Sequence, residues 1–326
     1  MGSEEAPAWS GMGQIAFSVA DLGRSREFYV GLLGFAYNGR ASFFNGAVAD
    51  KVLATAKVDH ELMWLSDRDP DFQLEFVQFT NPAHRPRRSS ASEADHGYRR
   101  MSLWVADFDA TVDRLVKAGH PPLASVHGAP GERRVCVHDP DGVVIELMET
   151  ETIGPGGGLP VAYDIPVRAR GLTLVVPDLD EAVMYFGDVL GMTQAPDFHD
   201  SEMEVLWGLA GAERISRCYW CGDHILELVE YQDSAGRGRD PEANLGDAGI
   251  YHFALIHPSA CAVRRTWHRQ HRAQCRSNSK PVYLLVTTLV YLRDPGDNLV
   301  ECLRIHPWVR RFVGYRGLPE REGVTI

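Results

Sequence analysis

Residues 21–35 read DLGRSREFYVGLLGF, and residues 178–192 read DLDEAVMYFGDVLGM. Each stretch opens with Asp-Leu, continues through an aromatic pair and closes with Leu-Gly. The spacing is the same in both copies, since Gly34 lies thirteen positions after Asp21 and Gly191 lies thirteen positions after Asp178. An internal repeat of this kind determines the architecture more strongly than any single motif does.

A second pattern also recurs. Residues 139–147 read DPDGVVIEL, and residues 294–303 read DPGDNLVECL, so an Asp-Pro turn twice precedes an apolar run that contains one Glu. The short runs of Val, Ile, Leu, Phe and Tyr between Gly, Pro and Asp predict β-α-β-β-β order in each repeat. Four modules of this kind are predicted, at about residues 11–80, 98–150, 170–231 and 249–304.

The modules divide the chain into two halves. Residues 1–153 hold the N-terminal pair of modules, and residues 170–305 hold the C-terminal pair. Residues 154–169 are predicted to form a linker, because GPGGGLP at 154–160 is typical of a flexible joint. A tail, residues 306–326, follows the last predicted strand.

The composition is that of a soluble globular protein, with 44% hydrophobic and 24% charged residues in 326. The net charge of −11 argues against a nucleic-acid partner, since phosphate binding needs a basic face. No apolar run approaches the roughly 20 residues that span a membrane. The acidic N-terminus lacks the pattern of a secretory signal, and the six cysteines are scattered. We therefore expect reduced thiols and a cytoplasmic protein.

The repeated patterns resemble the vicinal oxygen chelate superfamily, which includes glyoxalase I, bleomycin-resistance proteins and type I extradiol dioxygenases. The resemblance covers about residues 11–304. It implies an α+β fold in which four βαβββ modules pair into two cupped mixed sheets. In this family the first and last strands of each module can place a metal ligand inside a cup.

The ligand positions can be read by register. The first-strand position lies seven residues before the residue that opens the helix, namely Asp21, Asp107, Asp178 or, in the fourth module, Ser259. This register selects Gln14, Arg100, Gly171 and His252. The last-strand positions are Glu75, Glu146, Glu227 and Glu301. Each of these glutamates has apolar neighbours, so its carboxylate needs a cation or hydrogen bonds to offset desolvation.

The pairing of the modules decides which positions share a cup. Neighbour pairing would place Gln14, Glu75, Arg100 and Glu146 in one cup and Gly171, Glu227, His252 and Glu301 in the other. Crosswise pairing, first with fourth and second with third, would gather Gln14, Glu75, His252 and Glu301. The resemblance identifies this set with the Gln/Glu/His/Glu ligands of glyoxalase I. The other cup would then hold Arg100, Glu146, Gly171 and Glu227, closed by salt bridges. Crosswise pairing is favoured because it places all the residues that are suited to metal coordination in one cup.

The leading hypothesis is a metal-dependent, glyoxalase-like lyase or isomerase that acts on a small oxygenated substrate through a stabilised enolate. Its cofactor would be one divalent ion, Zn, Ni, Co, Mn or Fe(II), held by Gln14, Glu75, His252 and Glu301. The resemblance implies that Glu301 or Glu75 serves as the catalytic base. A homodimer is compatible with this reading.

Two alternatives stay open. An extradiol-type dioxygenase would need two His and one carboxylate around Fe(II), whereas His224 and His257 lie in the wrong register. A non-catalytic binding or resistance protein would use an aromatic cup, for which Trp64, Trp104, Trp207 and Trp220 are the candidates.

Overall fold

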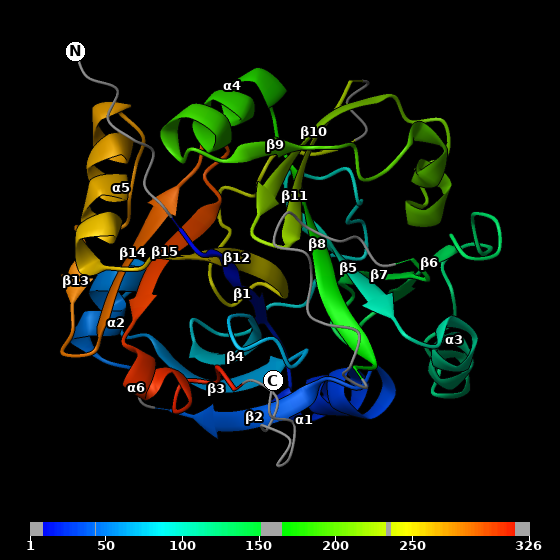
Figure 1. Ribbon diagram of the computed structural model, residues 1–326, viewed down its shortest axis with the longest axis horizontal. Helices are drawn as coiled ribbons and strands as arrows, with labels where there is room; N and C mark the ends of the chain where they lie inside the picture. The colour runs from blue at the N-terminus through cyan, green and yellow to red at the C-terminus, as the bar shows by residue number, and fades with distance from the viewer. Residues whose placement is uncertain (1–8, 43, 151–164, 233–235, 317–326) are drawn as a thin grey trace, which may run out of the picture.

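The computed structural model describes residues 9–42, 44–150, 165–232 and 236–316. Most of the predicted linker, residues 154–164, and the end of the predicted tail, residues 317–326, lie outside the described residues. Two mixed β-sheets form the body of the molecule, and short helices flank them (Figure 1). The predicted α+β class with two mixed sheets is confirmed. Within the described residues no helix is long and apolar enough to cross a membrane.

The eight-stranded sheet joins the first module to the fourth, in the order β13-β14-β15-β12-β1-β4-β3-β2. Strand β1 pairs antiparallel with β12 at the centre and parallel with β4. The pairing is therefore crosswise. The strands are β1 Gly11–Ser18, β2 Ala36–Ala41, β3 Asp59–Ser66, β4 Gln73–Asn81, β12 Gly249–Ile256, β13 Val282–Tyr283, β14 Thr287–Arg293 and β15 Leu299–Ile305.

The seven-stranded sheet joins the second module to the third, in the order β6-β7-β5-β8-β11-β10-β9. Its central pair, β5 and β8, is antiparallel. The strands are β5 Gly97–Val105, β6 Arg134–His138, β7 Val144–Met148, β8 Val167–Val175, β9 Thr193–Ala195, β10 Arg214–Cys221 and β11 His224–Tyr231.

The prediction of three strands after the helix is wrong for the second module. Within residues 97–150, all described, only β6 and β7 follow the helix, and His127 makes an isolated bridge to Arg134. Three prolines, Pro121, Pro122 and Pro130, lie in this segment. Proline lacks the backbone N–H that a strand ladder requires, so the segment forms a loop.

The residues at the repeated Asp position, which is Ser259 in the fourth module, begin the helices. The side chains of Asp21, Asp107, Asp178 and Ser259 each accept a backbone N–H in the first turn of the helix that follows. The helices are α1 Leu22–Arg26, η1 Glu27–Leu32, α2 Ala47–Leu53, α3 Phe108–Lys117, α4 Leu179–Val183, η2 Met184–Val189, η3 Ser201–Trp207, α5 Ala260–Arg272 and α6 Pro307–Arg310. Both η1 and η2 are π-helical turns at equivalent places in their modules.

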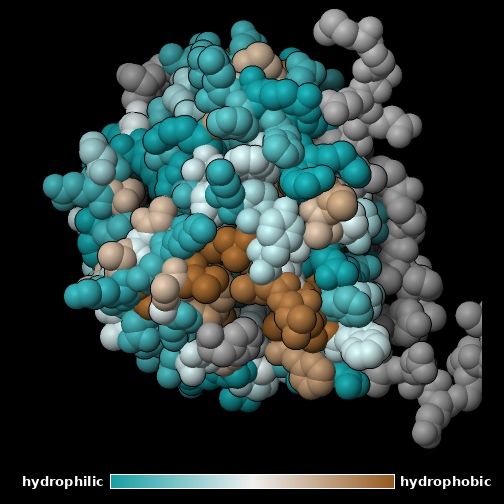
Figure 2. Space-filling view, turned by 90° about the vertical axis from the view of Figure 1, so that its left-hand side faces the viewer, coloured by the Kyte–Doolittle hydropathy of each residue, from teal (hydrophilic) through white to brown (hydrophobic). Residues whose placement is uncertain are grey.

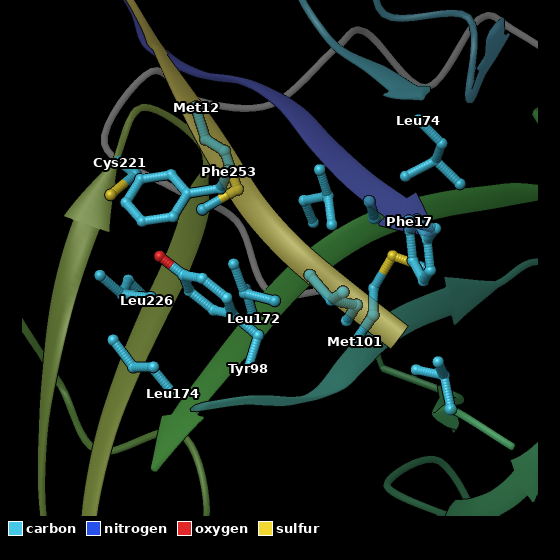
Figure 3. Packing of buried hydrophobic residues seen from close by; sticks show 14 of the residues in the cluster. Met12, Phe17, Leu74, Tyr98, Met101, Leu172, Leu174, Cys221, Leu226 and Phe253 are labelled. Carbon is cyan, nitrogen blue, oxygen red and sulfur yellow. The ribbon is translucent and has the colours of Figure 1, made fainter. Parts of the chain in front are cut away.

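Strand alternation separates the core from the candidate site. Leu74 and Phe76 of β4 belong to the main core, which both sheets and several helices share, while Glu75 between them faces the other way. Figure 3 shows this core, where Met101 and Phe253 come from different sheets. A second apolar cluster covers the opposite face of the eight-stranded sheet. That face also carries the predicted ligands.

Candidate functional site

The first cup is the face of the eight-stranded sheet that carries Gln14, Glu75, His252 and Glu301. These residues come from β1, β4, β12 and β15, which are adjacent in the sheet. Ala16 of β1 lies opposite both Glu75 and His252 in the ladders. Because side chains alternate along each strand, this register places the four side chains on one face.

The four side chains contact one another in sequence. Gln14 Nε2 lies 3.0 Å from Glu75 Oε2 and 3.3 Å from His252 Nε2. His252 Nε2 in turn lies 3.2 Å from Glu301 Oε2. Gln14, His252 and Glu301 are buried, and Glu75 is partly buried. Crosswise pairing therefore brings Gln14, Glu75, His252 and Glu301 into contact in one cup.

The carboxyl group of Glu75 has a perturbed pKa. Burial raises the pKa of Glu75 to about 7, and the negative charge of Glu301 acts in the same direction. The imidazole of His252 and hydrogen bonds from Trp64 and Gln14 act against this rise. A carboxyl group with a pKa near neutrality is suited to proton transfer.

The four side chains of the first cup are better suited to binding a cation than to hydrogen-bonding one another. His252 Nε2 faces an amide N–H of Gln14 on one side and a carboxylate oxygen of Glu301 on the other. A neutral imidazole nitrogen can satisfy only one of these neighbours. A divalent ion bound by the imidazole and both carboxylates would remove this conflict and offset the desolvation of Glu75 and Glu301.

The amide of Gln14 would have to turn to bind a cation through its oxygen. Its Oε1 accepts a hydrogen bond of 2.7 Å from Gln73 Nε2, while its Nε2 faces the cup. Gln73 Oε1 is buried and finds no hydrogen-bond donor in the described part of the chain. Turning both amides would give Gln73 Oε1 a donor and present Gln14 Oε1 to the cup.

The described residues contain no ready-made metal cluster of three or more His, Cys, Asp or Glu side chains. The carboxylates and the imidazole of the first cup instead contact the Gln14 amide and each other. The assignment of Gln14, Glu75, His252 and Glu301 as ligands therefore stays a prediction that rests on their chemistry and placement.

The second cup is the equivalent face of the seven-stranded sheet. His199 lies between its two glutamates, 2.8 Å from Glu146 and 2.7 Å from Glu227. Arg134 pairs with Glu146 at 3.2 Å, and Arg214 pairs with Glu227 at 2.9 Å. These ion pairs close the cup.

In the second cup, the charges of neighbouring groups outweigh the effect of burial on the pKa values of Glu146, Glu227 and His199. Burial alone would raise the pKa of both glutamates, but His199 and the neighbouring arginines hold the pKa of Glu146 well below its usual range. They lower the pKa of Glu227 to about 2. Burial likewise opposes a charge on His199, yet the two carboxylates raise its pKa above the ordinary value. Both carboxylates are therefore ionised at neutral pH, and they favour the protonated form of His199.

Arg100 lies in the second cup, and its positive charge helps to lower the pKa of Glu227. Arg134 and Arg214 make the salt bridges, while the Arg100 guanidinium lies 3.7 Å from the centre of the Trp207 ring. Trp207 ends η3, which packs against the β6 and β7 side chains Cys136 and Val144. The segment that closes the cup comes from the third module, and the register argument gave no sign of it.

The position two residues after each first-strand slot distinguishes the cups. In the second cup this position holds Ser102 and Thr173, whose hydroxyls donate to Glu146 and Glu227. In the first cup Ala16 and Ala254 hold the equivalent ladder positions. These alanines offer the carboxylates no donor, so the first cup keeps acceptor capacity for a ligand.

Gly171 lies under the segment that closes the second cup. A Cβ atom at this position would lie 2.5 Å from the ring of Phe198 and 3.2 Å from Ser102 Cβ. We expect Gly171→Ala to destabilise the protein by about 1–3 kcal/mol through overpacking. A thermal unfolding midpoint checks this, with Gly31→Ala as control because a Cβ there meets nothing within 4 Å. Equal midpoints for the two variants would contradict the packing.

The histidines of the dioxygenase alternative lie outside the first cup. His224 stacks on Phe72 with ring centres 4.4 Å apart, and burial lowers its pKa to about 3. His257 is bonded to Leu255 O and Thr266, each at 3.0 Å, and burial lowers its pKa to about 4. Both serve as core residues, so neither joins His252 in the first cup.

Aromatic side chains line the first cup, and only one of the predicted tryptophans is among them. Trp64 donates a 2.9 Å hydrogen bond from Nε1 to Glu75 Oε1. Trp207 lies in the second cup, Trp104 donates to Glu149 O, and Trp220 packs near Phe198. The sequence argument missed the remaining aromatic neighbours of the site, Tyr251, Tyr291 and Tyr315. Tyr251 could have been noticed because it adjoins His252.

Comparison with known proteins places these observations in a family. The profile of the Glyoxalase/Bleomycin resistance protein/Dioxygenase superfamily matches residues 11–147 and 169–302. Glyoxalase I from Zea mays superposes with a TM-score of 0.61 at 13% identity, covering 90% of this chain and 92% of the maize chain. A Bacillus subtilis protein described as a dioxygenase superposes with a TM-score of 0.64 at 17% identity, covering 95% and 88%. No curated protein matches in sequence.

Proposed function

Because the chain belongs to the Glyoxalase/Bleomycin resistance protein/Dioxygenase superfamily, we propose that it is a metal-dependent lyase or isomerase. Its substrate would be a small molecule with two adjacent oxygen atoms, one of them a carbonyl. The observation that supports the proposal is the convergence of Gln14, Glu75, His252 and Glu301 on one face of the eight-stranded sheet. The second cup has its carboxylates neutralised and offers no such face.

Each residue of the first cup has a part in the proposed reaction. His252, Gln14 and the carboxylates would hold a divalent ion, which supplies Lewis-acid stabilisation of negative charge on substrate oxygen. One carboxylate, Glu75 or Glu301, removes a proton from the carbon atom beside the substrate carbonyl. In an isomerisation the same carboxylic acid returns that proton to the neighbouring carbon. Trp64 orients Glu75 by its hydrogen bond and helps exclude water.

A proton-exchange experiment tests this function. The untagged full chain is loaded in turn with Zn, Ni, Co, Mn and Fe(II), and small α-hydroxycarbonyl compounds are followed by NMR in D₂O. We expect metal-dependent exchange of the C–H beside the carbonyl. Removal of a general base typically costs about 10²- to 10⁴-fold in rate, so Glu75→Gln or Glu301→Gln should lose exchange.

Glu146→Gln is the matched control, since Glu146 occupies the equivalent strand position in the second cup. It should keep the exchange activity. Absence of exchange with every metal would sink the proposal. Tight binding of aromatic compounds by metal-free protein would then favour the non-catalytic alternative, and oxygen uptake with catechols would favour the dioxygenase alternative.

A further inference from the structure

The C-terminal segment after β15 packs onto the first cup. The backbone at Gly314 has φ of +93°, and its carbonyl accepts a 2.6 Å hydrogen bond from Asn38 Nδ2. A Cβ atom at Gly314 would lie 2.2 Å from Gln73 Oε1 and 2.4 Å from Trp64 Cγ. Glycine is therefore required for the chain to turn this closely over the side chains that hold Gln14 and Glu75.

This turn carries Tyr315 into the cup. Its side chain belongs to the same apolar cluster as Trp64 and Tyr291, and only 4% of the residue is exposed. The carboxylates of Glu301 and Glu75 are the charged groups that act most strongly on it. The hydroxyl is buried and has no hydrogen-bond partner among the described residues. Because this hydroxyl is close enough to two carboxylates of the cup to feel their charge, it is placed to donate to a bound ligand.

We propose that Tyr315 is a substrate-binding residue whose hydroxyl donates a hydrogen bond to an oxygen atom of the ligand between Glu75 and Glu301. The inference rests on the proposed function and adds a residue from outside the four modules. A phenol hydroxyl is neutral at physiological pH, so it can donate to an oxygen that gains negative charge.

Apolar side chains surround the candidate ligands and favour a ligand with an apolar frame, while the Arg310 guanidinium lies 5.9 Å from the centre of the Tyr315 ring. Within the described residues, the hydrogen bonds and ring contacts of Gln14, Glu75, His252 and Glu301 involve no Lys or Arg side chain. Beside the C-terminal segment, His306 N donates to Val286 O at 2.8 Å. Large apolar side chains are exposed at the turn between β13 and β14 and on the C-terminal segment, including Leu285, Trp308 and Phe312. Figure 2 shows an apolar area on the side of the molecule where Figure 1 places β13 and α6.

The test measures binding of two hydroxamates, which present adjacent oxygen atoms, to the zinc-loaded full chain. Acetohydroxamate carries a methyl group, and benzohydroxamate carries a phenyl ring. We expect Tyr315→Phe to keep zinc stoichiometry and to weaken both hydroxamates about tenfold, as loss of one hydrogen bond predicts. Tyr315→Ala should weaken benzohydroxamate further than acetohydroxamate because the ring contact is also lost.

Tyr185→Phe is the matched control. Tyr185 is fully buried and lies in the main core, and its hydroxyl also lacks a partner within the ranges that the structure describes. Its replacement should leave hydroxamate affinity unchanged. Unchanged affinity in zinc-loaded Tyr315→Phe, or an equal loss in Tyr185→Phe, overturns this inference alone. Absence of zinc from the wild-type protein overturns the proposed function as well, and the zinc measurement separates the two failures.

Discussion

Replacing His252 by alanine is expected to abolish metal binding. His252 is the only nitrogen donor among the four candidate ligands, and its Nε2 is the atom that both Gln14 and Glu301 approach. Loss of a direct ligand should exceed the roughly 100-fold fall in affinity that loss of an outer contact can cause. Metal content of untagged protein, measured after reconstitution with each divalent ion, should fall from about one equivalent to near zero.

The chain offers a close control for this variant. His224 is also a buried strand histidine, but it stacks on Phe72 in the core. His224→Ala leaves a similar cavity and should retain the metal. Full metal content in His252→Ala would refute the ligand assignment, and equal loss in both variants would indicate damage to the fold.

Replacing His199 by alanine is expected to destabilise the protein strongly without touching the first cup. The side chains of His199, Glu146 and Glu227 are fully buried, so removal of the imidazole leaves two carboxylates facing each other. Breaking a buried charge pair by removing one partner costs about 3–5 kcal/mol. Since Arg134 and Arg214 remain, the lower end of this range is expected. Urea unfolding midpoints measure the loss.

The stabilisation by this network should depend on pH in a defined direction. The raised pKa of His199 means that its contribution is complete below the ordinary value of 6.5 and is lost as the pH rises through the folded value. The lowered pKa of Glu227 means that its contribution is complete above 4.5 and is lost as the pH falls through about 2. The wild-type advantage over His199→Ala should therefore be largest between pH 4.5 and 6.5.

A triple variant separates the effect of unpaired charge on stability from the effect of lost packing. Adding Glu146→Gln and Glu227→Gln to His199→Ala removes the uncompensated charges and should recover part of the lost stability. Metal content should stay unchanged in all these variants, because the first cup lies on the other sheet. A midpoint for His199→Ala that equals that of the wild type across this pH range would contradict the network.

The sequence predicted the fold class and the strand positions that face a cup, because both depend on periodicity. The repeated Asp residues begin equivalent helices, and the alternation around Glu75 and Glu301 places each carboxylate on the face opposite the core. The choice between pairings was an inference from ligand chemistry. Strand pairing between β1 and β12 joins residues far apart in the chain, and local patterns carry no direct record of it.

The sequence could not predict what closes each cup. His199 and Trp207 come from the segment between β9 and β10, which lies outside the repeated sequence patterns, and Tyr315 comes from a tail outside the repeat. Their positions depend on tertiary packing, and no period of 2 or 3.6 residues marks them. The loop of the second module was missed for a related reason, since apolar residues between prolines resemble a short strand.

Crosswise pairing has a consequence for the order in which the chain can fold. All strands of the seven-stranded sheet lie within residues 97–231, whereas the eight-stranded sheet needs residues 11–81 and 249–305. During synthesis from the N-terminus, the seven-stranded sheet can form while β1 still lacks its partner strand β12. An unpaired edge strand is prone to aggregation, so the first module depends on protection until the fourth emerges. A chain that stops before β15 lacks Glu301 and cannot complete the candidate metal site.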